Sequence, residues 1–216
     1  MRITSLIDVD NTLIDNDAAK VEIDRRLGAL LGEQGTTDFW AAYEEVRTEQ
    51  GVVDIPRAMA RYLGPTASLA RRIALAALFM EFPFGDYIVP GARETVAFLR
   101  TRGPVAILSD GDPVFQASKV TRAGLADLVD GHMLIYVHKE EHLPEIAAAF
   151  PAGRYLLIDD KPTVIERFTA RKEELGAPLE TILVRQGKYA AAVPPGPWSD
   201  ATHTVNALSE VPGLFK

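Results

Sequence analysis

The chain of 216 residues contains no cysteine, so disulfides, thiolate zinc sites and cysteine nucleophiles are excluded. Long apolar runs are also missing, because the most apolar segment, residues 73–80, is far too short to cross a bilayer. Acidic residues follow the first short apolar run at once, so we expect no signal peptide. Basic residues are fewer than acidic ones, and the net charge of −7 argues against a general nucleic-acid binder. We therefore expect a cytoplasmic protein with no nucleic-acid partner and no membrane partner.

The first segment with a clear pattern is residues 2–13. Ile3, Leu6 and Ile7 form the apolar body of a short buried strand, and Asp8 and Asp10 follow it. In an extended segment, side chains two residues apart point to the same side. Two carboxylates held that close repel each other, and a hard divalent cation such as Mg²⁺ is the usual compensation. Taken alone, a solvated acidic turn at the end of a strand explains the segment equally well.

Residues 15–87 have a helical pattern with no β-type alternation. Gly32 is a plausible end for the first helix, Thr37 or Asp38 could cap the second, and Pro56 could begin the third. The apolar spacing predicts helices at residues 18–31, 38–49, 55–62 and 68–80. Because this block directly follows the first strand and its acidic turn, we interpret it as an all-helical cap domain over that turn. The alternative is that these are ordinary crossover helices of the core.

After Pro90 and Gly91 the chain alternates between strands and helices. Continuous apolar runs predict strands at residues 104–108, 133–137, 155–158 and 181–184, and a short strand is expected in the tail near residues 203–205. Continuous rather than alternating apolar strands indicate a parallel sheet covered on both faces. We therefore predict an α/β protein with a Rossmann-like core of residues 1–14 and 88–216, and a helical cap of residues 15–87.

Polar clusters follow the predicted strands at the point where each one ends. They are Ser109 with Asp110, then Lys139, then Asp159 with Asp160. In open parallel sheets the ligand crevice lies at the carboxyl ends of the strands. The sequence therefore predicts that these side chains meet Asp8 and Asp10 in one site.

These residues resemble the four motifs of the haloacid dehalogenase-like (HAD) superfamily of hydrolases. The segment Asp8-Val9-Asp10-Asn11-Thr12 is similar to the first motif, Ser109 to the second, Lys139 to the third, and Asp159-Asp160 to the fourth. The family places a helical cap between its first and second motifs. The resemblance implies a Mg²⁺-dependent phosphatase that acts on a small phosphorylated substrate through an aspartyl-phosphate intermediate, as a monomer or homodimer.

The resemblance also implies a role for each residue. Asp8 would be the nucleophile, and Asp10 would donate a proton to the leaving group and later accept one from water. Lys139 would pair with Asp8 and the phosphate. The implied phosphate-binding residues are Asn11, Thr12, Ser109, Asp110 and Lys139. The implied metal site is formed by Asp8, Asp159, Asp160 and Asp10, the last through its backbone carbonyl.

Several alternatives remain open at this point. Ser109 could cap the following helix, unless Asp112 does so, and Asp159-Asp160 could cap another. Glu140 and Glu141, which follow Lys139, could hold that lysine at the surface, which would leave Lys161 or Lys188 as the active-site lysine. A phosphomutase would use the same residues, and a non-catalytic binding or regulatory protein could share the scaffold. The dehalogenase branch lacks the second aspartate, so Asp10 favours a phosphatase.

Overall fold

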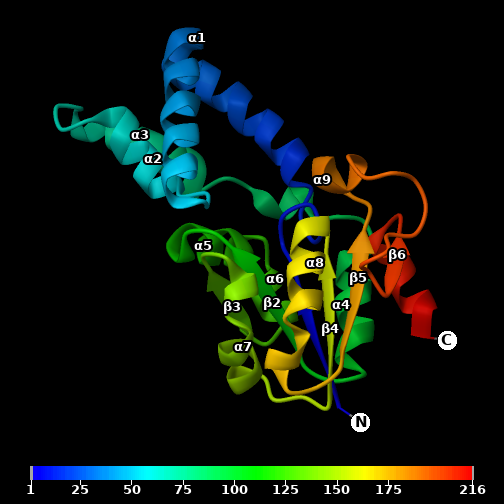
Figure 1. Ribbon diagram of the computed structural model, residues 1–216. Coiled ribbons are helices and arrows are strands. Elements are labelled where there is room, and N and C mark those ends of the chain that lie inside the picture. The colour runs from blue at the N-terminus through cyan, green and yellow to red at the C-terminus, as the bar shows by residue number, and fades with distance from the viewer. Residues whose placement is uncertain (1, 216) are drawn as a thin grey trace.

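Six parallel strands form a single sheet, in the order β3-β2-β1-β4-β5-β6 (Figure 1). The computed structural model describes residues 2–215, and within that range all side chains except those of Ala190 and Ala191. The strands are β1 (Ile3–Ile7), β2 (Val105–Asp110), β3 (Met133–Tyr136), β4 (Arg154–Asp159), β5 (Leu179–Val184) and β6 (His203–Val205). No helix in this range has the length and hydrophobicity that a membrane crossing requires.

Helices connect the strands and extend beyond them. The α-helices are α1 (Asn16–Gln50), α2 (Ile55–Leu63), α3 (Leu69–Met80), α4 (Ala92–Arg100), α5 (Pro113–Arg122), α6 (Leu125–Leu128), α7 (Leu143–Ala149), α8 (Pro162–Ala170) and α9 (Gly187–Ala191). The 3₁₀ helices are η1 (Phe84–Tyr87), η2 (Lys139–Glu141), η3 (Lys172–Leu175) and η4 (Leu208–Phe215). The predicted α/β class with a parallel sheet is confirmed.

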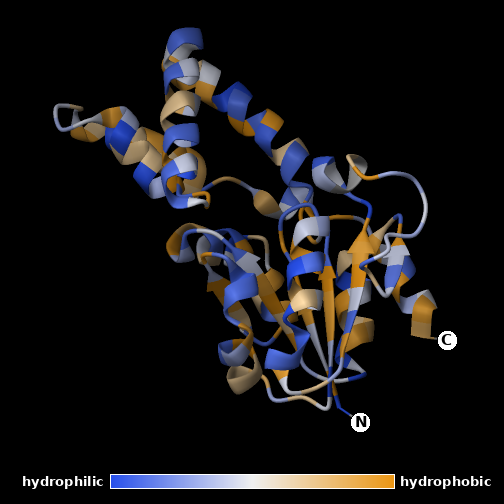
Figure 2. Ribbon diagram, in the orientation of Figure 1, coloured by the Kyte–Doolittle hydropathy of each residue, from blue (hydrophilic) through white to orange (hydrophobic). Residues whose placement is uncertain are grey.

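Two hydrophobic clusters cover the two faces of the sheet, which explains why the strands are apolar throughout. Successive strand residues point to opposite faces, so Ile7 belongs to one cluster and Leu6 to the other. Residues of α4, α5 and η4 complete the first cluster, and residues of α7 and α8 complete the second. Figure 2 shows these hydrophobic strands with helices of mixed polarity around them.

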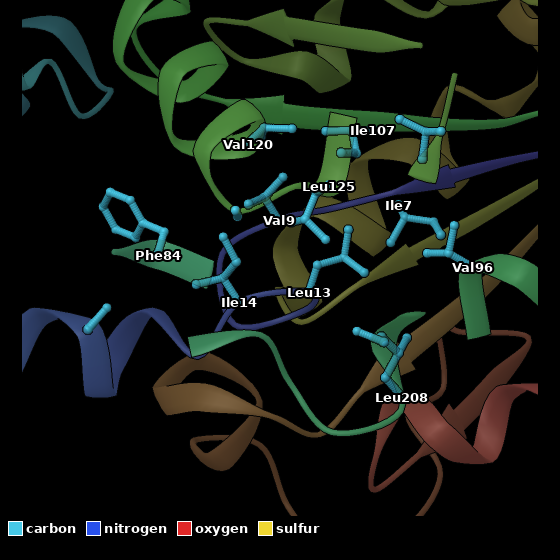
Figure 3. Close-up of a cluster of buried hydrophobic side chains, with 14 of the residues drawn as sticks. Ile7, Val9, Leu13, Ile14, Phe84, Val96, Ile107, Val120, Leu125 and Leu208 are labelled. Atoms are coloured by element: carbon cyan, nitrogen blue, oxygen red, sulfur yellow. The ribbon is translucent and has the colours of Figure 1, made fainter. Parts of the chain in front are cut away.

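The loop after β1 is anchored in the first of these clusters. Val9, Leu13 and Ile14 are fully buried, and Figure 3 shows them beside Phe84 and Val120. The carbonyl of Val9 accepts hydrogen bonds from the backbone N–H groups of Leu13 and Ile14, both at 2.9 Å. Tight packing on one side of this loop therefore fixes the positions of the polar residues between these anchors.

The helices α1, α2 and α3, which we call the inserted helices, lie between β1 and β2 in the chain. They add no strand to the sheet and extend from the edge at which the strands end (Figure 1). Phe39 of α1 stacks on Phe79 of α3 with ring centroids 5.2 Å apart, and Trp40 packs edge-on against Phe39. Aromatic contacts of this kind hold the inserted helices to one another.

The predicted N-cap at Thr37 or Asp38 is wrong. Gly32 does interrupt α1, with φ 75° and ψ 173°, but the helix resumes immediately after it. Thr37 therefore lies within a helical turn, and its hydroxyl donates to the carbonyl of Glu33 at 3.1 Å. A single glycine in a non-helical conformation redirects the helix axis without a separate capped start.

Candidate active site

The sheet order brings four polar segments together at one edge. β1 lies between β2 and β4, so Asp8 after β1, Ser109 in β2 and Asp159 at the end of β4 are neighbours. Lys139 reaches them from η2, directly after β3. These four side chains and Asp160 are each at most 2% exposed. The predicted meeting of these residues at the carboxyl ends of the strands is therefore observed.

Asp8, Asp159 and Asp160 form a compact acidic group. Each offers a carboxylate oxygen, and these oxygens lie within 4.8 Å of one another. Lys139 Nζ lies 2.5 Å from Asp8 Oδ1 and 2.7 Å from Asp159 Oδ2. Among the described residues, Asp8 Oδ2 and both oxygens of Asp160 are buried without a hydrogen-bond partner. Lys139 thus pairs with two of the three carboxylates, and the charge of Lys161 also acts on Asp8 and Asp160.

Burial and neighbouring charges shift the pKa values of this group. Burial raises the pKa of Asp8 to about 7, against the opposing charge of Lys139. Burial, with the charges of Asp159 and Asp8, raises the pKa of Asp160 to about 9. Burial disfavours the charged form of Lys139, but Asp159 and Asp8 outweigh it and raise the pKa of this lysine well above its usual value. Further positive charge nearby would favour the ionised forms of Asp8 and Asp160.

The carboxyl group of Asp10 does not belong to the acidic group. Its side chain is 27% exposed, its Oδ1 pairs with Lys119 Nζ, and its Oδ2 accepts a hydrogen bond of 3.1 Å from Gln116 Nε2. Burial acts to raise the pKa of Asp10, but the charge and hydrogen bond of Lys119 outweigh it and lower that pKa. Asp8 and Asp10 are therefore close in sequence but have different surroundings.

Thr12, in the loop after β1, and Ser109, near the end of β2, each carry a buried hydroxyl group. Thr12 Oγ1 is buried and has no partner among the described residues, and Ser109 Oγ lies 3.1 Å from Gln116 Nε2. Ser109 does not cap α5, because the carboxylate of Asp112 accepts the N–H of Phe115 at 2.7 Å. Both hydroxyl groups are thus available to a ligand at this edge of the sheet.

Asn11 and Asp110 make local contacts instead of lying free in the site. Asn11 has φ 61°, and its Oδ1 accepts the N–H groups of Asn16 and Asp17 at the start of α1. Asp110 Oδ1 accepts the backbone N–H of Lys139 at 2.8 Å. Asn11 therefore fixes the first connection to the inserted helices, and Asp110 fixes the segment that carries Lys139.

The alternative lysines occupy other places. Lys161 follows Asp160, lines a cavity that also contacts Asp10, and its backbone N–H donates to Asp159 Oδ1 at 2.8 Å. Lys188 is exposed, and its backbone N–H bonds to Asp17. Lys139 is fully buried against Asp8, whereas Glu140 pairs with Arg167. Glu140 therefore does not hold Lys139 at the surface.

A cavity of about 400 Å³ opens beside Asp10, between the inserted helices and the edge of the sheet. The core contributes Asp10, Asp110, Lys119 and Lys161 to its lining, and the inserted helices contribute Lys20, Trp40, Tyr43 and Arg47. Lys20 Nζ lies 4.6 Å from the centroid of the Trp40 ring. Asp8 does not line this cavity. Trp40 and Tyr43 of α1 pack against the hydrophobic core and also face this space.

Gln116 and Lys119 were not predicted from the sequence. They lie one turn apart on α5, but nothing in a local pattern shows that a lysine on a helix is buried against an aspartate 109 residues away. The proline and apolar residues of α5 predict a helix and give no sign of these contacts.

The fold and the site define an α/β protein with a buried carboxylate centre at the carboxyl edge of a parallel sheet. The haloacid dehalogenase-like hydrolase family matches residues 4–149, and the chain therefore belongs to this family of hydrolases. No curated protein sequence gives a significant match.

Solved structures agree with this assignment. A haloacid dehalogenase-like hydrolase from Burkholderia xenovorans LB400 is 34% identical, with 99% of this chain and 96% of that one covered and a TM-score of 0.85. The HAD hydrolase YfnB from Bacillus subtilis is 17% identical (100% and 99% covered, TM-score 0.63). An L-2-haloacid dehalogenase from Xanthobacter autotrophicus is 18% identical (100% and 98% covered, TM-score 0.59). The last two likenesses establish the fold alone.

Proposed function

We propose that the protein is a Mg²⁺-dependent phosphatase that hydrolyses a small phosphorylated metabolite through a phosphorylated Asp8. The observation that carries this proposal is the buried group of Asp8, Asp159 and Asp160 next to an aspartate in a separate environment, Asp10. The acidic group suits a cation and a nucleophile, and Asp10 suits proton transfer. A hydrolase that attacks through one carboxylate and moves protons with another needs both.

The residues fit a divalent cation. Asp8 Oδ2 and the two oxygens of Asp160 are buried and unpartnered among the described residues, and hard cations prefer carboxylate oxygens. Asp8, Asp159 and Asp160 would hold the ion, and it would supply the positive charge that lets a phosphate dianion approach these carboxylates. YfnB, which shares only the fold with this chain, was crystallised bound to magnesium.

The reaction follows from these positions in two steps. In the first, a carboxylate oxygen of Asp8 forms a bond to phosphorus, the bond between phosphorus and the ester oxygen breaks, and Asp10 gives a proton to the leaving alkoxide. Because Lys119 lowers the pKa of Asp10 in the free protein, Asp10 has to take up this proton before the step. In the second, water attacks phosphorus, its proton passes to Asp10, and the bond to Asp8 breaks. Inorganic phosphate leaves, and Asp8 and Asp10 are restored.

The neighbouring polar groups would stabilise the transferred phosphoryl group. The free hydroxyl of Thr12 and that of Ser109 can donate to its oxygens, and Lys139 can share its charge between Asp8 and the phosphoryl group. Phosphoryl transfer depends mainly on positioning and charge compensation, which these buried donors provide.

The cavity under the inserted helices would hold the alcohol part of the substrate. Its volume suits a small metabolite, and its lining combines aromatic and charged side chains. Asp8 does not line it, but Asp10 and Asp110 do, and we propose that the phosphate reaches Asp8 past these two residues. YfnB is described as undergoing interdomain movement, and we propose that residues 15–87 act as a mobile cap here too.

Hydrolysis of a panel of phosphomonoesters and 2-haloacids, each with Mg²⁺ or with excess chelator, tests this proposal. We expect phosphate release that requires Mg²⁺ and no halide release, because Asp10 has no place in the dehalogenase pattern. Halide release, or full phosphatase activity in chelator, would contradict it. Interconversion of sugar phosphates without phosphate release would indicate a phosphomutase, and no turnover of any substrate would favour a binding or regulatory protein.

A further inference from the structure

Lys119 is a buried lysine that the mechanism above does not use. Its side chain is 3% exposed, and its ammonium pairs with Asp10 and donates to Asn16 Oδ1 at 2.8 Å. The same ammonium lies 4.9 Å from the ring centroid of Phe84. Asn16 begins α1 and Phe84 begins η1. One side chain therefore contacts Asp10 and both connections between the inserted helices and the sheet.

Gln116, one turn earlier on α5, holds the other side of Asp10. Its Nε2 lies 3.1 Å from Asp10 Oδ2, 3.1 Å from Ser109 Oγ and 3.0 Å from the carbonyl oxygen of Asp110. Together with Lys119, it gives each oxygen of the Asp10 carboxylate its own donor on α5. The same amide also links Asp10 to Ser109.

The chain makes room for this close approach of α5. Gly111 has φ 141°, and a Cβ at that position would lie 2.8 Å from Cγ of Gln116. Any other residue there would push the glutamine side chain away from Asp10. A lysine on a helix ordinarily extends its ammonium into water, and burying it is costly unless it is paired. The partners of the buried Lys119 ammonium are Asp10 and Asn16.

Resting on the proposed phosphatase activity, we infer that Lys119 is a positioning residue for Asp10. Together with Gln116, it fixes the orientation of the Asp10 carboxyl group relative to the reacting atoms. Because Lys119 also contacts Asn16 and Phe84, this orientation depends on the position of the two segments that connect the inserted helices to the sheet. Proton transfer needs the carboxyl group within hydrogen-bond reach of the leaving oxygen or the water, so a small misplacement is costly. Lys119 itself does not have to touch the substrate.

A double-mutant cycle in steady-state kinetics with Mg²⁺ and an alkyl phosphate tests this inference. We expect Lys119→Met to lower kcat roughly 10- to 100-fold with little change in KM. Lys119→Arg, which keeps a donor and a charge, should recover part of the loss. When Lys119→Met is added to Asp10→Asn, kcat should fall by less than about twofold further, because the positioned group is already disabled. Lys172→Met, which removes an exposed lysine of η3, is the charge-matched control and should behave as wild type.

The inference would be overturned if kcat of the double variant fell by the product of the two single-variant factors, or if Lys119→Met raised KM at unchanged kcat. Lys119 would then be a substrate-binding or purely structural residue. Thermal unfolding checks the fold of each variant. If Lys119→Met does not fold, Gln116→Leu replaces it in the cycle, with the same expected absence of a further loss. A wild-type protein that releases no phosphate from any ester would overturn the proposed function and this inference together. If the wild-type enzyme is active but the two single-variant losses in kcat multiply in the double variant, only this inference is overturned.

Discussion

At the scale of single residues, surroundings rather than sequence spacing separate Asp8 from Asp10. Asp8 is 2% exposed and lies in the acidic group with Lys139, whereas Asp10 is 27% exposed and pairs with Lys119. Two carboxyl groups with such different partners can perform two different tasks in one reaction. The sequence predicted that both would matter and that Lys139 would reach Asp8. It could not predict Lys119, because that contact depends on the packing of α5 against the loop after β1.

Asp160 gives a prediction about stability at this scale. Both of its oxygens are buried without a partner, so Asp160→Asn should raise the free energy of unfolding in chelator by about 1–2 kcal/mol. The same change removes a metal ligand. Mg²⁺ should therefore raise the Tm of the wild-type protein and raise that of the variant much less. Thermal unfolding with and without Mg²⁺ measures both effects, and an equal Mg²⁺ shift in the two proteins would exclude Asp160 from the metal site.

At the scale of elements, continuous apolar runs made the strands predictable. β2 and β4 are buried on both faces along almost their whole length, which is the reason their sequences lack alternation. The polar residues at their ends were predictable for the same reason, since parallel strands end at one edge. The restart of α1 directly after Gly32 could not be predicted, because Thr37 and Asp38 are good N-cap residues by type but lie inside the helix.

Ser109, near the end of β2, and Asp112, the N-cap of α5, give a matched pair of variants at this scale. Asp112 caps the helix, so Asp112→Ala should lower the free energy of unfolding by about 1 kcal/mol. Ser109→Ala leaves the cap intact and removes a proposed phosphate donor, so it should lower kcat/KM with a smaller change in stability. Denaturant unfolding and phosphatase kinetics on both variants check this. The reverse pattern would make Ser109 a structural residue.

At the scale of the whole molecule, the inserted helices leave and re-enter the core at one point. The N–H of Asp15 donates to the carbonyl of Tyr87 at 2.8 Å, and the N–H of Val89 donates to the carbonyl of Leu13 at 3.0 Å. Ends this close are typical of a segment that can be removed. The predicted division into a core of residues 1–14 and 88–216 and a cap of residues 15–87 stays a prediction.

Replacing residues 18–81 with a short Gly/Ser linker tests that division and keeps Asn16 and Phe84, the partners of Lys119. We expect a soluble protein that unfolds cooperatively, binds Mg²⁺ and hydrolyses a nitrophenyl phosphate slowly. It should lose discrimination among phosphorylated metabolites, because the residues of the inserted helices that line the cavity are gone. Circular dichroism and kinetics on the shortened chain provide the measurement, and an unfolded product would show that these helices belong to the core.

The central claim is that Asp8 becomes phosphorylated during turnover, and intact-mass measurement after rapid acid quench tests it most directly. Asp10→Asn keeps the nucleophile but lacks the group that activates water, a contribution of roughly 10²–10⁴-fold. With Mg²⁺ and a nitrophenyl phosphate, whose leaving group needs little protonation, this variant should accumulate one added phosphoryl group that peptide sequencing maps to Asp8. Asp8→Asn, tested in parallel, should carry none. A phosphoryl group on Asp8→Asn, or one that maps to another residue in Asp10→Asn, would contradict the account.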